Sequence, residues 1–205
     1  HVRAAVLAAR EEGFSLPVVW NTGGYETVEA IRANTDVVDV YLTDFKYADP
    51  ALGVRYSSVS DYPQRALEAL AAMIDEVGSP VYDKYRGDER MTRGVIVRHL
   101  LLPGHVDDSM RVVRMLHERF GDALRLSLMN QYTPVLATAA QRGDAQAARV
   151  LRACPELAGR VEPDDYERLL DFADAIGVED YYWQEGGACE DSFIPAFSCE
   201  PQDAD

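Results

Sequence analysis

The sequence contains no apolar run close to the ~20 residues that a membrane-spanning helix needs, so a span of that kind is excluded. Basic residues are also scarce, since 20 Lys and Arg face 35 Asp and Glu and leave a formal net charge of −15. A chain of that charge repels a phosphate backbone, so we expect no nucleic-acid partner. The acidity is typical of a soluble protein, and we expect a cytoplasmic one that does not bind membranes.

Several catalytic and binding motifs are missing. There is no GxGxxG or GxxxxGK(S/T) phosphate loop, no GxSxG turn around a nucleophilic serine, and no HExxH or His/Asp cluster for a catalytic metal. The three cysteines, Cys154, Cys189 and Cys199, are widely spaced and form no CxxC pair. Reduced cytosolic thiols therefore explain them better than a disulfide framework, and we expect no metal ligands in the sequence.

What the sequence does contain is enough material for one substantial core, since 47% of its 205 residues are hydrophobic and 27% are charged. Short apolar runs predict strands at 16–20, 37–42, 94–102 and 123–129, with a shorter one at 178–183. Helical spacing predicts helices at 2–12, 26–33, 64–77, 107–120 and 164–175, with further helical decoration within 135–160 that Gly143 interrupts. Residues 78–92 are expected to be a polar connection.

Two of these elements carry more detailed expectations. In the first helix Val2, Val6 and Leu7 are candidates for the buried stripe, and Gly13 ends the helix. The helix that follows the third strand is expected to be capped by Asp107 or Asp108.

An apolar strand, a polar turn and a helix recur four times, which is the pattern of βα units around a parallel sheet. The strand at 16–20 is wholly apolar, as expected of a parallel strand covered on both faces. A doubly wound sheet and a (β/α) barrel both satisfy the pattern. A complete eight-unit barrel needs ~250 residues, and the sequence starts on a helix with no strand before it. A section of a larger barrel therefore fits better than a complete domain.

Polar residues follow each predicted strand, and parallel folds place their active sites at the carboxyl ends of strands. After the first strand, Asn21 and Thr22 offer short polar side chains, and Gly23-Gly24 lets a ligand approach the backbone closely. The alternative is a tight turn into the next helix, with Asn21 or Thr22 as the helix cap.

Charged residues mark the second and third strands. Asp44 and Lys46 are two residues apart, so they project to the same side of an extended backbone and could hold a zwitterion such as an amino-acid group. The alternative is a salt bridge at the strand end. Arg98 and His99 face opposite sides of the third strand. Arg98 needs a ligand or a core carboxylate such as Asp44, and His99 is expected to be a hydrogen-bonded core residue.

The fourth strand is followed by Asn130, Gln131 and Tyr132. Their amides and phenol suit hydrogen bonds to a ribose or an adenine, and they equally suit the end of a core.

Three segments of the sequence resemble proteins related to pyruvate formate-lyase activating enzyme, which belong to the radical S-adenosylmethionine (radical-SAM) superfamily. The segments are VVWNTGGYETVEAIRANTDVVDVYLTDFK, RGVIVRHLLLPGHVDDSMRVVRML and LSLMNQYTP, and the resemblance covers roughly residues 1–134 in order. The Asn-Thr-Gly turn, the Asp-Phe-Lys strand end and the Arg-His…Leu-Pro-Gly strand occur together, which makes the resemblance fairly specific.

The resemblance implies a partial (β/α)6 barrel over residues 1–134. Composition and helical spacing predict a helical extension over 135–185 that completes the domain, and a loose acidic tail over 186–205. The resemblance also implies S-adenosylmethionine and a 4Fe–4S cluster as cofactors, with the cluster held by a CxxxCxxC motif. Reductive cleavage of S-adenosylmethionine gives methionine and a 5′-deoxyadenosyl radical that abstracts hydrogen. In the activating proteins the target is a backbone glycine of a partner, so a glycyl-radical-type protein substrate and an electron donor are the implied partners.

The resemblance further implies a set of cofactor-binding residues: Asn21, Thr22, Asp44, Lys46, Arg98 and Gln131. Asn21 and Thr22 occupy the turn at the methionine end of the cofactor, and Asp44 and Lys46 lie beside it. Tyr132 is an alternative to its neighbour as the residue that reaches the cofactor from the fourth strand. The family turn often begins with Asp where this sequence has Asn21, which argues against a cation site there.

The sequence lacks two features of the family on which activity depends. It has neither the CxxxCxxC motif nor the Gly-Gly-Glu type of strand end. In such proteins both lie near the N-terminus, so we expect truncation ahead of His1 and no cleavage of S-adenosylmethionine by this chain alone. Two alternatives stay open. One is a degenerate barrel that acts as a binding or interaction protein, and the other is an unrelated barrel enzyme that uses Asp44, Lys46 and His99 for acid–base chemistry.

Overall fold

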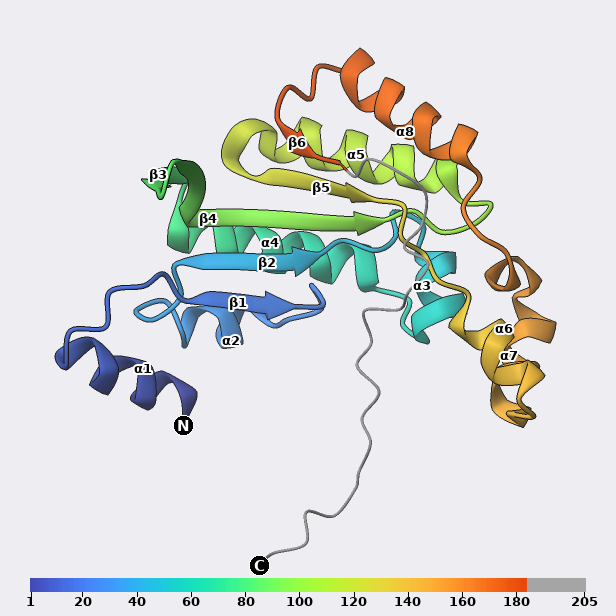
Figure 1. The fold of residues 1–205 in the computed structure, drawn as a ribbon, viewed down its shortest axis with the longest axis horizontal. Helices are drawn as coiled ribbons and strands as arrows, with labels where there is room; N and C mark the ends of the chain where they lie inside the picture. The colour runs from blue at the N-terminus through green and yellow to red at the C-terminus, as the bar shows by residue number, and fades with distance from the viewer. Residues whose placement is uncertain (184–205) are drawn as a thin grey trace, which may run out of the picture.

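The computed structural model describes residues 1–183, and its centre is a mostly parallel sheet (Figure 1). The strands are β1 (Val19–Thr22), β2 (Val40–Asp44), β3 (Val81–Tyr85), β4 (Asp88–Leu100), β5 (Arg125–Met129) and β6 (Tyr181–Tyr182). Five of them pair in parallel in the order β1-β2-β4-β5-β6, and β3 pairs antiparallel with β4. The protein therefore has an α/β fold, as the sequence predicted.

Helices cover one face of the sheet, and others lie at its edge and beyond its carboxyl end. The helices are α1 (Val2–Glu11), α2 (Val28–Arg32), α3 (Pro50–Ser57), α4 (Tyr62–Val77), α5 (Val106–Phe120), α6 (Val135–Gln141), α7 (Ala145–Ala153) and α8 (Pro163–Ala175), with 3-10 turns η1 (Gly121–Ala123) and η2 (Pro155–Ala158). In Figure 1, α2, α4 and α5 lie behind the strands, and α8 packs against α5. Leu70 and Leu116 of these helices share one buried core with Val97 and Leu128 of the strands, and burying each such side chain contributes about 2 kcal/mol.

The opposite face of the sheet is only partly covered by the described residues. Its partly exposed apolar side chains include Leu42, Ile96, Leu100 and Met129. The prediction that the first strand is covered on both faces is wrong, because Leu16 is 64% exposed and Val19 is 53% exposed. The strand order explains this. The strands follow the sequence without reversal, and right-handed crossovers then place successive helices on the same face.

The first two strands lie nearer the C-terminus than predicted. β1 covers Val19–Thr22 instead of 16–20, and β2 covers Val40–Asp44 instead of 37–42. Val37 and Val38 are buried, but both their N–H groups bond to the Asn34 carbonyl in the turn that precedes β2. Apolar character therefore located the core correctly, while the strands themselves extend into the polar residues that had been assigned to turns.

Residues 78–92, predicted to be a polar connection, contain a hairpin. β3 pairs with the first part of β4, so that Val81 lies opposite Arg93 and Tyr85 lies opposite Asp88. Arg86 and Gly87 between the strands have φ values of 53° and 96°, the positive values that tight primed hairpin turns require. Charged side chains occupy most positions of this hairpin, so no buried-strand pattern is visible in the sequence.

α5 begins at Val106, and neither Asp107 nor Asp108 caps it. Asp108 is instead 4% exposed, and its carboxylate accepts hydrogen bonds from the main-chain N–H groups of Ala48 at 3.1 Å and Asp49 at 3.0 Å. The side chain therefore fixes the loop between β2 and α3. α3 itself was not predicted.

α1 forms where the sequence predicted a helix, but its packing differs. Val2 of the expected buried stripe is 78% exposed, whereas Val6 and Leu7 pack against the core. An ion pair of 2.7 Å joins Arg10 to Asp39 at the start of β2.

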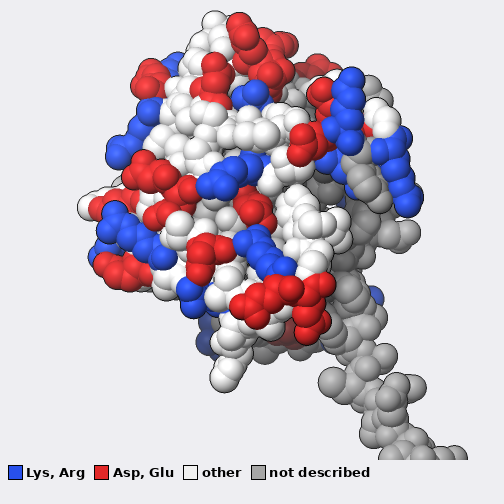
Figure 2. Space-filling model, turned by 90° about the vertical axis from the view of Figure 1, so that its left-hand side faces the viewer, with Lys and Arg blue, Asp and Glu red and all other residues white. Residues whose placement is uncertain are grey.

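Figure 2 shows the end of the molecule from which the parallel strands start. Among the residues drawn in colour, basic and acidic side chains are intermingled, and no continuous basic area is visible. One ion pair at this end joins Arg125 to Asp180 at 3.3 Å.

Across residues 1–183, no helix has the length and apolar character needed to cross a membrane.

The helical decoration predicted within 135–160 is present as α6, α7 and η2, and Gly143 with a φ of 93° separates the two helices. The last helix, α8, also lies where it was predicted. The expected tail over 186–205, with Cys189 and Cys199, lies outside the described residues.

Glu156 of η2 joins this extension to the rest of the molecule. Its carboxylate accepts a hydrogen bond from Tyr56 Oη and lies 2.9 Å from Arg55 Nη2. The Tyr56 proton is donated to Glu156, so His105 Nε2, 2.7 Å from Tyr56 Oη, is assigned as a donor to the phenol oxygen. A single acidic side chain therefore connects η2 to α3 and to the loop before α5.

This attachment should weaken in acid. Burial acts to raise the pKa of Glu156, but the hydrogen bond from Tyr56 and the charge of Arg55 outweigh burial, and the pKa is lowered from 4.5. A lowered carboxyl pKa stabilises the folded state above the unfolded value, and this contribution is lost as the pH falls through the folded value. We expect hydrogen exchange in η2, corrected for the intrinsic rate, to accelerate several-fold below pH 4.5. In Glu156→Gln that acceleration should be absent, and equal acceleration in both proteins would contradict the assignment.

Candidate functional site

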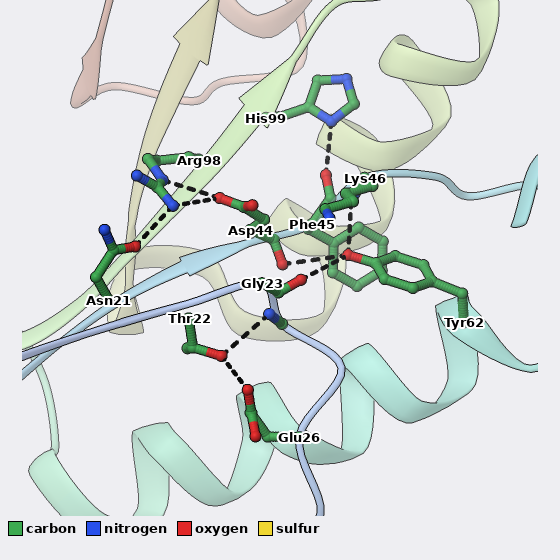
Figure 3. A network of polar contacts seen from close by, with 11 residues as sticks. Asn21, Thr22, Gly23, Glu26, Asp44, Phe45, Lys46, Tyr62, Arg98 and His99 are labelled. Atoms are coloured by element: carbon green, nitrogen blue, oxygen red, sulfur yellow. Dashed lines mark hydrogen bonds and ion pairs between the residues drawn. The ribbon is translucent and has the colours of Figure 1, made fainter. Parts of the chain in front are cut away.

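Three strands bring polar side chains together at their carboxyl ends (Figure 3). Asp44 of β2 is the register neighbour of Arg98 of β4, and β1 ends beside them with Asn21 and Thr22. Arg98 Nε donates to Asp44 Oδ1 at 2.8 Å, and Arg98 Nη2 lies 2.7 Å from the same oxygen. Arg98 Nη2 also donates to Asn21 Oδ1 at 2.9 Å. Arg98 thus pairs with the carboxylate that the sequence offered as its alternative partner, and it joins three neighbouring strands.

A cavity of about 420 Å³ opens beside this ion pair. Its lining residues are Asp44, Lys46, Tyr47, Arg98, Leu100, Leu102 and Met129. Asp44 and Lys46 line the same cavity while Phe45 between them is buried, as strand alternation predicted. One wall of the cavity is therefore charged and the other is apolar.

Two charged atoms at this cavity have no partner within the described part of the chain. The Lys46 ammonium makes no hydrogen bond or ion pair there, and the side chain is exposed. It lies over the turn after β1, because a Cβ added to Gly23 would sit 3.8 Å from Lys46 Nζ. Asp44 Oδ2 also accepts no hydrogen bond from residues 1–183, since Arg98 contacts only Oδ1. The cavity therefore presents one basic and one acidic group that are free to bind a ligand.

Thr22 lies on the other side of β1. It is 6% exposed, and its hydroxyl donates to the Glu26 carboxylate and accepts from Gly24 N at 3.4 Å. Thr22 therefore shapes the turn and does not line the cavity. It does not cap α2 either, because the N-cap of that helix is Thr27.

The residues that follow β5 contribute little to the cavity. Gln131 is not among the lining residues, and the Tyr132 phenol donates to the Leu157 carbonyl at 2.7 Å. Asn130 Oδ1 is buried and has no hydrogen-bond partner in the described chain. Met129, which the sequence analysis did not single out, supplies the contact from this strand.

His99 is a hydrogen-bonded core residue, as predicted. It is 1% exposed on the helix side of β4, with Nδ1 2.7 Å from the Phe45 carbonyl and Nε2 2.8 Å from Ser109 Oγ. A carbonyl only accepts, so we assign the proton to Nδ1, and Nε2 accepts from the serine. Burial lowers the pKa of His99 and favours the neutral ring. His99 faces away from Asp44 and Lys46, so an acid–base site built from these three residues does not form.

The apolar wall of the cavity was missed in the sequence. Leu100 and Leu102 follow Arg98 at spacings of two, so alternation along the third strand would have placed Leu100 on the same face as Arg98. Neither residue was singled out in the sequence, and both were treated as part of the apolar strand.

No metal centre is formed by the described residues, since no group of three or more His, Cys, Asp or Glu side chains could hold an ion among them. Cys154 is the single cysteine in residues 1–183. It is buried, and its Sγ lies 3.4 Å from Arg55 Nε of α3.

Comparison with known proteins does not place the chain in a family. No family model matches the sequence. The chain is similar to an uncharacterized protein of Methanocaldococcus jannaschii, with 27% identity over 168 residues. The matched region covers 82% of this chain and 41% of the relative, so the chain spans about two fifths of that protein's length. The likeness extends over most of the described fold but brings no activity with it.

Proposed function

We propose that this chain forms the S-adenosylmethionine-binding part of a radical-SAM oxidoreductase that is similar to glycyl-radical activating proteins. The observation that supports it is the pairing of the free Lys46 ammonium with the free Asp44 Oδ2 across one cavity at the strand ends. The methionine end of S-adenosylmethionine is a zwitterion, and a site with one group of each sign suits it.

Each residue has a separate part in this proposal. Lys46 binds the carboxylate of the ligand, and Asp44 Oδ2 accepts hydrogen bonds from its ammonium. Arg98 is a positioning residue, because it holds Asp44 and Asn21 in place through its bonds to their side chains. The wall of Leu100, Leu102 and Met129 offers apolar contact to the uncharged parts of the ligand.

The same proposal includes the finer fold, a section of a (β/α) barrel. Two features favour it. The parallel strands follow the sequence order without the reversal that defines a doubly wound sheet, and the helices that cover the sheet, α2, α4 and α5, lie on the same face. The partly exposed face, with the cavity at its carboxyl end, corresponds to the inside of such a barrel.

The described residues do not fit the 4Fe–4S cluster, because they contain one cysteine, which is buried against Arg55. In the proposal the cluster ligands belong to residues outside these 205, and we derive no step through the cluster. Hydrogen abstraction from a glycyl-radical-type protein substrate and the supply of an electron by a donor protein remain part of the proposed function.

The sequence offers a matched pair of variants, because Lys46 and Lys84 are its two lysines. Lys84 is exposed on β3, at the opposite end of the sheet. Lys46→Ala should weaken S-adenosylmethionine binding about tenfold or more, because it removes a charge-assisted hydrogen bond. Lys84→Ala should leave it unchanged, as equilibrium dialysis with labelled ligand would show. Equal affinities of the two variants would refute the assignment of Lys46.

A binding protein without an iron cluster is the second candidate, because the charged and apolar groups of the strand-end cavity could hold a zwitterionic ligand without one. Anaerobic reconstitution of the gene product, including any coding sequence in frame ahead of His1, separates the two. About four iron and four sulfide per chain, the content of one 4Fe–4S cluster, support the radical-SAM function. S-adenosylmethionine binding without iron supports the binding protein instead.

A further inference from the structure

The phenol of Tyr62 meets the backbone of two strand-end turns at once (Figure 3). Tyr62 stands in the first turn of α4 and is 2% exposed. Its Oη accepts a hydrogen bond from Lys46 N at 3.0 Å and lies 3.4 Å from the carbonyl oxygens of both Gly23 and Asp44. One hydroxyl proton can be donated to one of these carbonyls at a time, so the phenol is shared between the turns after β1 and β2.

The ring of Tyr62 is held independently of its hydroxyl. It stacks on Tyr25 with ring centroids 5.9 Å apart, and it meets Phe45 and Tyr47 edge-on at 6.1 and 5.3 Å. Such aromatic contacts keep the ring in place through packing. Removal of the hydroxyl alone should therefore leave the ring where it is.

The second of the two turns that share this phenol carries the ligand-facing groups, since Asp44 and Lys46 line the cavity. Asn21 precedes the first turn, and Asp44 and Lys46 belong to the second. Arg98 joins the strand ends through side chains, whereas Tyr62 is the one side chain in residues 1–183 that hydrogen-bonds to the main chain of both turns. The hydrogen bond from Lys46 N to the phenol holds the main chain of the residue whose ammonium faces the cavity beside Asp44.

We infer that Tyr62 is a positioning residue of the strand-end site, whose hydroxyl ties the β2 turn to the β1 turn and holds the main chain of Lys46, so that the Lys46 ammonium faces the cavity. The ligand's identity rests on the proposed function, while the link between the turns stands on geometry alone.

Tyr62→Phe tests this, with Tyr166→Phe as the matched control. Tyr166 is also buried and also donates to a main-chain carbonyl, that of Leu128 at 2.8 Å, but it contacts neither turn. In Tyr62→Phe the Lys46 amide loses its acceptor, so its hydrogen exchange should accelerate about tenfold, while in Tyr166→Phe it should not change. Unchanged Lys46 exchange in Tyr62→Phe would overturn the inference, whether or not the protein binds S-adenosylmethionine.

Ligand binding supplies the second measurement. S-adenosylmethionine affinity should fall about tenfold in Tyr62→Phe and stay at the wild-type value in Tyr166→Phe. An equal loss in both variants would mean a general structural effect and would overturn the positioning role. Failure of the wild-type protein to bind the ligand would refute the proposed function, and the exchange measurement would still decide the role of Tyr62.

Discussion

Gly24→Ala is expected to destabilise the protein by about 3 kcal/mol, from backbone strain and a steric clash together. Gly24 has a φ of +82°, a conformation that side chains rarely adopt, and a Cβ there would lie 2.0 Å from the Asp44 carbonyl oxygen. That oxygen belongs to the end of a strand that is paired on both sides, so it cannot move away without disturbing the sheet. The same change should push the two strand-end turns apart.

Gly104→Ala is the control for the backbone conformation. Gly104 has a φ of +74°, but a Cβ there would meet nothing within 4 Å. Its cost should be the left-handed penalty alone, about 1 kcal/mol. Urea unfolding of both variants measures the difference. Equal stabilities would show that the β1 turn does not pack against Asp44 as closely as described.

Asp108→Ala is expected to destabilise the protein by about 3 kcal/mol, because it leaves two main-chain N–H groups of a partly buried loop without their acceptor. These groups belong to Ala48 and Asp49, in the loop that leads from Lys46 to α3. Arg111 Nη2, 3.2 Å from the Asp108 carboxylate, would also lose the nearer of its two carboxylate partners and keep Asp49 at 3.9 Å. In Asp108→Ala the loop that contains Lys46 should therefore become less ordered, while the whole protein becomes less stable. Hydrogen exchange of residues 45–49 should accelerate.

The neighbouring residue gives a control on the same helix turn. Asp107 has a side chain that is 86% exposed and a surface ion pair of 3.6 Å with Arg168. Asp107→Ala should cost less than about 0.5 kcal/mol. Asp108→Asn keeps one acceptor oxygen, so its free energy of unfolding should lie between those of the two alanine variants. If Asp107→Ala and Asp108→Ala were equally stable in thermal and urea unfolding, the buried carboxylate would have no special role.

The sequence was most informative where a long helix buries one face. α4 and α8 were predicted almost to the residue, because each combines a proline at its start with an apolar stripe. The hairpin of β3 was missed, because it is exposed and its alternating charges carry no signal of burial. The first strands were misplaced by two or three residues, because buried valines in a turn look the same as buried valines in a strand.

The site was predictable in part for a similar reason. Asp44, Lys46 and Arg98 were found because charged residues interrupt apolar strands, and alternation fixed their direction. Asp108 and Tyr62 could not be found this way. Asp108 bonds to amides 59 and 60 residues away, and Tyr62 bonds to a carbonyl 39 residues away, so only the folded chain brings these partners together.

Titration of the isotope-labelled chain with S-adenosylmethionine, followed amide by amide in ¹H–¹⁵N NMR spectra, tests the central claim most directly. We expect saturable shifts at Gly23, Gly24 and Lys46, which the Arg98→Met variant should abolish. The account would be contradicted by no saturable change, or by shifts confined to the cavity of about 330 Å³ near Tyr82 at the other end of the sheet.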